Sequence, residues 1–355
     1  MKIRSLPLQI GLFIAPVILA LALAALLVLA VGADPLAVLQ TIWEGATRDS
    51  RALGQMVNFW MPLTLVSIGL IVTFTAGLWN IGVEGQMVMG AVFATWGALT
   101  LDLPQPLLVA AEIALAMLGG TLWAALVGVL KTRLGVHEIF GGVALNALSN
   151  VLLIYLISGP WQPPEGGSVR GTPPFPDAAI PSFLSDTFKV SLVAVLVVAA
   201  ALVAVVLALR GTRWGLELKA TGKNARSALL LGVPTRRAAM SAFVVCGALA
   251  GIAGLYRVLF TFVSASLRPG VSGGIGFLGV LVVLLIAVRP VWVPFVTLIF
   301  AVVLGGSARL QIALGVDSSL AGVLQGSLVL IVLLFNGLRG RLAAREETAE
   351  VTAHE

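Results

Sequence analysis

Charged residues are scarce in this chain. Asp, Glu, Lys and Arg make up 11% of its 355 residues, whereas apolar residues make up 59%. Soluble globular domains contain about a quarter charged residues, so this composition excludes an ordinary soluble domain. A bilayer span needs about 20 apolar residues, and segments of that kind follow one another along the chain. We therefore predict an all-α, polytopic membrane protein.

The residues and motifs of catalysis are also missing. Cys246 is the one cysteine and His137 and His354 are the two histidines, which excludes an internal disulfide and a histidine-based metal site. The sequence contains neither a phosphate-binding G-x-x-x-x-G-K-[ST] loop nor an H-E-x-x-H zinc motif. We predict a non-catalytic chain without metal or cofactor, so any ATP must be used by another subunit. An intramembrane enzyme would need a nucleophile cluster, a ligand set or an acid pair.

Ten apolar segments are predicted to form membrane helices, two of them short or broken. They cover residues 9–32, 56–79, 85–103, 107–130, 139–160, 188–209, 238–262, 275–288, 291–308 and 318–338. Lys2 and Arg4 before the first segment imitate a signal peptide, but the apolar region is longer than the usual 7–15 residues of such a peptide. An uncleaved first span is the better interpretation.

The basic residues indicate the orientation of the chain. If the loops alternate across the membrane, fifteen of the 22 Lys and Arg residues lie on one side. Basic residues gather on the cytoplasmic side of membrane proteins, so both termini are predicted to be cytoplasmic. The same rule explains the net charge of +6 without a nucleic-acid partner.

The chain is predicted to form a single integral-membrane domain, residues 1–345, followed by a flexible cytoplasmic tail, residues 346–355. Two loops are long enough to have a structure of their own. The proline-rich segment 161–187 disfavours regular helix and suits an extended cover on the outer face, although it could be a mere connector. The basic segment 211–237 lies on the cytoplasmic side.

Two glycine-rich segments, residues 74–90 and 269–279, interrupt the apolar pattern. The first contains Asn80, Glu84 and Gln86, which should face protein or a water-filled path because polar groups facing lipid are costly. The alternative is a tight cytoplasmic turn with a solvated glutamate. The second segment leads into the apolar run 275–288, which is too short to cross a bilayer and indicates a broken or re-entrant helix. Such segments in both halves are typical of transport pathways, or of close-packing seams.

Polar residues also occur inside the apolar segments. Asn146 and Asn150 are one helical turn apart, so they share a face and either line a polar path or bond helix to helix. Glu112 and Arg257 are expected to extend toward the membrane interface.

The cytoplasmic segment contains a candidate docking element. Residues 224–231 are predicted to form a short helix, bounded by Gly222 before it and by Gly232 and Pro234 after it. Flanking arginines would make it a basic protrusion, suited to receiving force from a soluble partner. An ordinary solvated loop is the alternative.

These residues resemble a known family. Gly222, Asn224, Ala225 and Ala228, followed by Gly232, are similar to the coupling-helix motif of ATP-binding-cassette importer permeases in the branched-chain amino acid and simple-sugar superfamily. The run N-I-G-V-E-G-Q at residues 80–86 resembles the signature of the nucleoside permeases, as does His137-Glu138 followed by Leu145-Asn146. The similarity extends from about Pro62 to Gly337. The chain departs from the pattern at Ala144 and in the glycine-free run 282–288.

The resemblance implies a permease subunit in the bacterial inner membrane that imports nucleosides. Its partners would be an ATP-binding-cassette ATPase, a second permease subunit of the same or a homologous kind, and an extracytoplasmic solute-binding protein. Asn80, Glu84, Gln86, Asn146 and Asn150 would border the substrate path. Gly222, Asn224, Ala225, Ala228 and Gly232 would couple the chain to the ATPase.

Two other functions are consistent with the sequence. One is a permease for a simple sugar or another small polar solute. The other is a secondary transporter driven by an ion gradient, although the sequence contains no buried carboxylate pair in the centre of a predicted span, as many proton-coupled carriers require.

Overall fold

The computed structural model describes residues 18–19, 22–164, 171–260 and 266–334, and all regular structure within these ranges is helical. The chain divides into two compact units, which are described separately below. The larger is Asp49–Ala301, and the smaller combines Met1–Arg48 with Val302–Glu355. The predicted tail 346–355 and the first part of the predicted span 9–32 lie outside the described residues.

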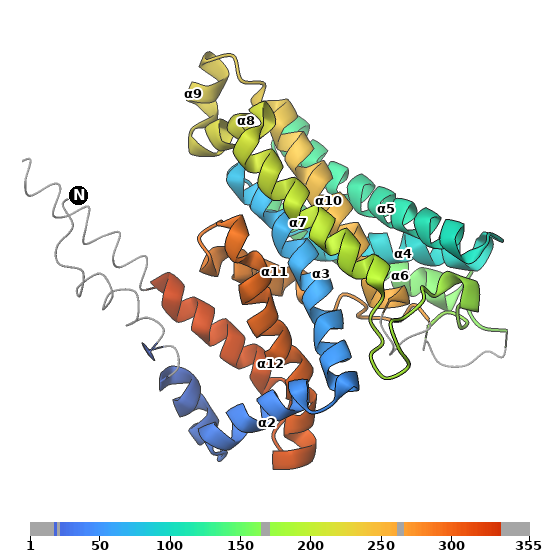
Figure 1. Cartoon of the computed structure of the whole chain (residues 1–355). Helices are drawn as coiled ribbons and strands as arrows, with labels where there is room; N and C mark the ends of the chain where they lie inside the picture. Colours follow the sequence, from blue (N-terminus) through green and yellow to red (C-terminus); the bar gives the residue numbers. More distant parts are fainter. Residues whose placement is uncertain (1–17, 20–21, 165–170, 261–265, 335–355) are drawn as a thin grey trace, which may run out of the picture. The chain divides into compact units, whose positions relative to one another are not determined.

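The larger unit contains most of the helices (Figure 1). These are α3 (Ser50–Thr75), α4 (Val83–Thr100), α5 (Gln105–Leu134), α6 (Glu138–Ser158), α7 (Leu192–Gly211), α8 (Arg213–Lys223), α9 (Ala225–Leu230), α10 (Thr235–Leu259) and α11 (Ile275–Leu285), with the 3₁₀ turns η1 (Asp177–Ala179) and η2 (Pro290–Trp292) and the beginning of α12 (Val293–Leu314).

Several of these helices can cross a membrane. Within the described residues six are long and apolar enough, or seven if the bent pair Ala22–Ala30 and Pro35–Thr47 counts as one span. The six are α3, α5, α6, α7, α10 and the segment Pro290–Leu314. An all-α, multi-pass protein is therefore confirmed, while the number of ten spans stays a prediction. The helix α11 has 11 residues, or about 16 Å at 1.5 Å per residue, which is half of a bilayer core.

Close packing of small residues holds the centre of this unit together. The helix α10 packs against α3, α4 and α5. A Cβ atom added to Gly251 of α10 would collide with the carbonyl oxygen of Ala116 on α5, and one added to Gly90 of α4 would collide with the Gly251 backbone. Glycine at these positions lets the helices approach until their backbones touch, which is a common way of packing membrane helices.

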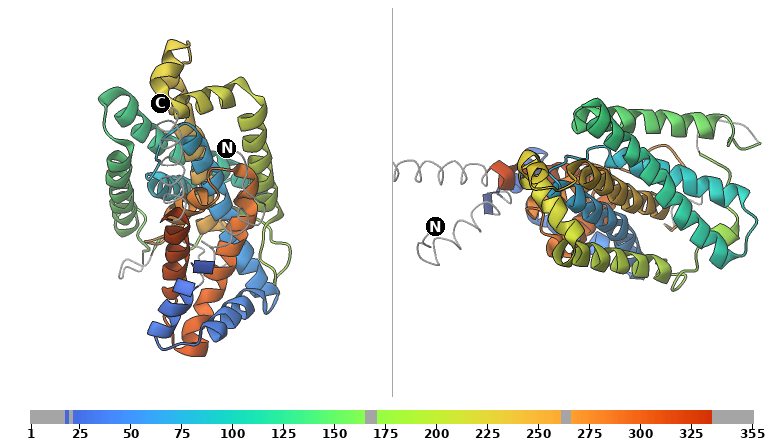
Figure 2. Two further views of the ribbon diagram at one scale, coloured as in Figure 1. Left: turned by 90° about the vertical axis from the view of Figure 1, so that its left-hand side faces the viewer. Right: turned by 90° about the horizontal axis from the view of Figure 1, so that it is seen from above.

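The cytoplasmic segment predicted from the sequence forms two helices at one end of the unit (Figure 2). The short helix predicted at residues 224–231 is confirmed as α9, Ala225–Leu230. The helix α8 is not predicted from the sequence. This helix begins where the Thr212 hydroxyl accepts a hydrogen bond from the Gly215 N–H at 3.1 Å, an N-cap that follows directly after the end of α7.

The proline-rich segment forms no α-helix in its described part, residues 161–164 and 171–187, as predicted. It is fastened to the rest of the unit at two places. The backbone of Thr172 and the backbone of Leu267 bond to each other at 3.0 Å, and the side-chain amide of Gln105 donates to the Ile180 carbonyl at 2.6 Å.

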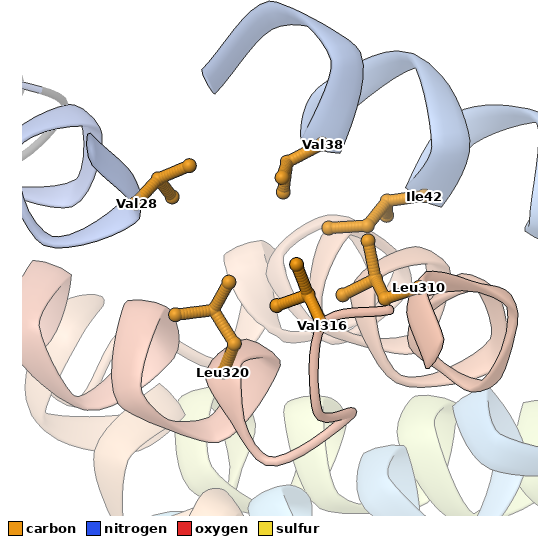
Figure 3. Packing of buried hydrophobic residues seen from close by; sticks show 6 residues of the cluster. All are labelled: Val28, Val38, Ile42, Leu310, Val316 and Leu320. Atoms are coloured by element: carbon orange, nitrogen blue, oxygen red, sulfur yellow. The ribbon is translucent and has the colours of Figure 1, made fainter. Parts of the chain in front are cut away.

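The smaller unit has its own apolar cluster, drawn in Figure 3. The helix Ala22–Ala30 and α2 (Pro35–Thr47) meet at an angle of 100°. Their side chains pack against the second part of α12 and the helix Leu320–Leu334, and the cluster consists of Val28, Val38, Ile42, Leu310, Val316 and Leu320. No helix is predicted from the sequence where α2 lies. The missed signal is Asp34, which caps α2 by accepting from the Leu36 N–H, followed by Pro35 in the first turn.

Candidate functional site

The turn between α3 and α4 carries the N-I-G-V-E-G-Q run, and its polar side chains are buried. Asn80 and Gln86 face each other as a pair of amides: the Asn80 Nδ2 donates to the Gln86 Oε1 at 3.1 Å, and the Gln86 Nε2 donates to the Asn80 Oδ1 at 3.0 Å. Asn80 also donates to the Cys246 sulfur on α10 at 3.1 Å. Both amides are fully buried. Bonding satisfies their polar atoms and fixes the turn against α10.

Glu84 links the two glycine-rich segments predicted from the sequence. Its carboxylate accepts hydrogen bonds from the Gly274 N–H at 3.0 Å and the Gly276 N–H at 2.7 Å. These amides form the N-terminus of α11, where the helix dipole favours a negative charge. Gly274 has φ +75°, which glycine adopts without strain. The alternative of a tight turn with a solvated glutamate is therefore wrong as regards the glutamate, because Glu84 is 6% exposed.

Arg257 contacts the same segment. Its Nε donates to the Val271 carbonyl at 3.1 Å, and its guanidinium lies 5.2 Å from the centre of the Phe59 ring. The positive charge is also attracted by Glu84. The expectation that Arg257 extends toward the membrane interface is therefore wrong, because it is used inside the protein to position residues 271–276.

Asn146 joins α6 to the turn. Its Oδ1 accepts from the Gly85 N–H at 2.7 Å, and its Nδ2 donates to the Ile81 carbonyl at 2.9 Å. Of the two uses that the sequence allows, the structure shows helix-to-helix bonding for this residue. Asn150 bonds within its own helix, with its Nδ2 donating to the Asn146 carbonyl at 2.9 Å. Asn80, Glu84, Gln86 and Asn146 thus gather around one turn, and Asn150 follows on the next turn of α6.

A second ionic link supports this turn. Glu138, the first residue of α6, forms an ion pair with Lys131 of α5 at 2.6 Å and accepts from the Trp79 N–H at 3.4 Å. From the sequence alone, Glu138 is noted only as part of the His137-Glu138 motif, and no role is predicted for it. Its pairing depends on the approach of the ends of α5 and α6, which are separated by a short connection beginning at Gly135 with φ +70°.

Glu112 does not lie where the sequence predicts. It is fully buried in α5, and neither oxygen of its carboxyl has a hydrogen-bond partner among the described residues. Its neighbours include Gly97 of α4, whose Cβ position lies 3.8 Å from the Glu112 Cγ. It therefore does not extend toward the interface.

The predicted coupling residues lie within α9 or directly beside it. Asn224 caps this helix, with its Oδ1 accepting from the Ser227 N–H at 2.9 Å. Ala228 is buried, and its carbonyl accepts from the Val233 N–H at 3.0 Å where the chain turns at Gly232, φ +81°. Ala225 begins the helix and is exposed.

Three leucines at the tip of α9 are exposed. Leu229, Leu230 and Leu231 expose 60%, 83% and 84% of their surface. Large apolar side chains exposed together at the end of a short helix are candidates for a protein-binding surface.

Gly222 connects α9 to the signature turn. A Cβ atom on Gly222 would collide with the Thr75 carbonyl oxygen at the end of α3, and the Cβ position of Gly77 lies 3.0 Å from the Gly222 Cα. Gly77 has φ +74° and directly precedes residues 78–82 of the turn. Backbone therefore contacts backbone between the end of α8 and the turn that positions Glu84.

A cleft of about 580 Å³ opens beside this contact. The ends of α3 and α5 and the beginning of α10 line it, together with the residues that connect α8 to α9. Its charged lining residues are Lys131, Lys223 and Arg236, and its hydroxyl-bearing residues are Thr132, Thr221 and Thr235.

Comparison with known proteins agrees with this architecture. The family model for the permease component of branched-chain amino acid transport systems matches residues 52–333. The glucose ABC transporter permease of Haloferax volcanii is 28% identical over 93% of this chain and 89% of its own length. The guanosine ABC transporter permease of Bacillus subtilis is 28% identical over 89% of this chain and 90% of its own length. A nucleoside ABC transporter permease of Lactococcus lactis is 27% identical over 80% of this chain and 80% of its own length.

Proposed function

The chain belongs to the family of permease components of branched-chain amino acid transport systems, and on this basis we propose that it is the membrane subunit of an ATP-driven nucleoside importer. The choice of nucleosides is supported by relatives named as guanosine and nucleoside permeases. The observation that carries the proposal is α9, a capped helix with exposed leucines at the end of the larger unit. A helix of this kind can receive the movement of a separate ATPase.

The proposed assembly has three further components. An ATP-binding-cassette ATPase docks on α9, a second permease subunit completes the path, and an extracytoplasmic binding protein delivers the solute. The complex lies in the inner membrane of a bacterium with both chain termini in the cytoplasm. The bias of the basic residues supports this orientation.

The route of coupling follows contacts within the larger unit. Movement of α9 reaches Gly222, which touches Gly77. The following turn contains Glu84, which holds the N-terminus of α11. We propose that Asn80, Glu84, Gln86, Asn146 and Asn150 border the path. The first four also fix the shape of this turn, because each is hydrogen-bonded to groups in it or packed against it.

Uptake competition tests the substrate class. In a strain that lacks this gene, the restored chain should import labelled guanosine, and excess unlabelled adenosine should compete while glucose should not. A permease for a simple sugar is the second candidate, and a glucose permease among the relatives favours it. Competition by glucose, without competition by adenosine, would support this second candidate and contradict the first.

A further inference from the structure

The cleft beside α9 has an unbalanced charge. Lys131, Lys223 and Arg236 line it, and its lining contains no Asp or Glu. Lys131 is paired with Glu138 at 2.6 Å, but Lys223 and Arg236 form no ion pair within the described part of the chain. Two cations thus remain available in the lining, Lys223 at the end of α8 and Arg236 at the beginning of α10.

The other lining residues and the size of the cleft are also compatible with a bound anion. The hydroxyl group of Thr235 and the side-chain amide of Asn224 supply neutral hydrogen-bond donors. The hydroxyl groups of Thr132 and Thr221 donate instead to the Gly128 and Glu217 carbonyls of their own helices. The volume of about 580 Å³ lies within the roughly 300–1,000 Å³ of protein binding pockets. A positive bias of the cytoplasmic face explains why cations occur on this side, but not why they surround one cleft that lacks carboxylates.

The position of the cleft favours a protein segment as its occupant. Asn224 and Ala225, at the beginning of α9, form part of its wall. The exposed Leu229, Leu230 and Leu231 lie on the following turn. A partner that covers these leucines therefore extends over the opening of the cleft.

We infer that the cleft binds an acidic segment of the ATPase subunit, so that docking combines an apolar contact on α9 with a charged contact beside it. This inference rests on the proposed function for its partner, but its chemistry can be tested without transport. Opposite charges at an interface increase the rate and specificity of association more than its strength, and their effect falls with salt.

The first test uses a fluorescent hexaglutamate peptide and the purified full chain in neutral lipid nanodiscs. The cleft variant carries Lys223→Glu and Arg236→Glu. The control variant carries Arg226→Glu and Arg237→Glu, which changes the same charge at exposed neighbours that do not line the cleft. We expect the cleft variant to bind the peptide at least tenfold more weakly than the native chain, and the control variant to stay within threefold.

A second pair of substitutions excludes misfolding as the cause. Lys223→Gln with Arg236→Gln removes the cleft charges without placing a negative charge at the end of α8, and it should also weaken peptide binding, with an unchanged elution volume and melting temperature. Equal binding by the cleft and control variants, or no binding by the native chain, would overturn the inference. So would a result in which the cleft charges retain anionic phospholipid but not the peptide, because the cleft would then be a lipid site.

The same variants separate this inference from the proposed function. Copurification with a co-expressed ATPase subunit should fall in the cleft variant and become less sensitive to salt. If the peptide binds as expected but the complex shows no ATP-driven uptake, the proposed function fails and the anion-binding cleft stands. If uptake is normal in the cleft variant and peptide binding is unchanged, the cleft inference fails alone.

Discussion

Glu84 is the residue whose surroundings explain most about the candidate site. A carboxylate in an apolar interior is costly unless charged and hydrogen-bonded partners offset the loss of water. Here two backbone N–H groups of α11 and the nearby charge of Arg257 do so. The carboxylate therefore serves as the missing cap of a helix whose own N-cap residue, Gly274, has no side chain.

Removing this carboxylate should destabilise the fold. In Glu84→Ala the N–H groups of Gly274 and Gly276 lose their acceptor, at a cost of about 1–3 kcal/mol for each buried group. Glu84→Gln keeps one acceptor oxygen and should cost less. The melting temperature of the purified chain measures both, with Glu217→Ala as the control because Glu217 forms an exposed pair with Arg213. Equal melting temperatures for Glu84→Ala and Glu217→Ala would contradict the role of Glu84.

At the scale of helices, packing and docking depend on different surfaces. The contact of α10 with α4 and α5 depends on glycines whose backbones touch, whereas α9 presents side chains outward. The first surface stabilises the fold, and the second is the surface proposed to dock the ATPase.

Filling the glycine contact should damage the fold. In Gly251→Ala the new methyl group collides with the Ala116 carbonyl oxygen and approaches the Gly120 Cα, which is backbone that cannot move aside. Overpacking of this kind costs about 1–3 kcal/mol. Gly211→Ala is the control, because nothing lies within 4 Å of its Cβ position. The melting temperature should fall clearly for Gly251→Ala and stay unchanged for Gly211→Ala. Similar unfolding curves for the two variants would mean that α10 does not pack as described.

Changing the tip of α9 should affect transport and leave the fold intact. Leu230 is 83% exposed, so Leu230→Ser removes apolar surface without opening a cavity. We expect normal insertion and melting temperature, with uptake at least tenfold lower at a limiting ATPase concentration. Leu216→Ser changes a leucine of α8 that is 63% exposed, and it should transport normally. Ala228 is a poorer position to test, since its burial means that a charged substituent would also disturb the packing of α9. Normal uptake by Leu230→Ser would remove the docking role.

For the whole molecule, hydropathy predicts the class of protein and the approximate positions of its long helices, because each span must satisfy its backbone within an apolar run. It does not predict α2 and α8, whose starts depend on single capping residues, Asp34 and Thr212. The cluster of polar residues could be predicted in part: Asn80, Glu84 and Gln86 share one segment. The contacts of Glu84 with Gly274 and of Glu138 with Lys131 could not, since they join residues brought together by packing.

We propose that an ATPase drives transport through this chain. The most direct test reconstitutes the chain in liposomes, with and without its ATPase and binding protein, and measures the uptake of labelled guanosine. Uptake should require all components and ATP hydrolysis, and an imposed proton or sodium gradient should not replace them. Accumulation of guanosine by the chain alone under an ion gradient would contradict the account and identify a secondary transporter.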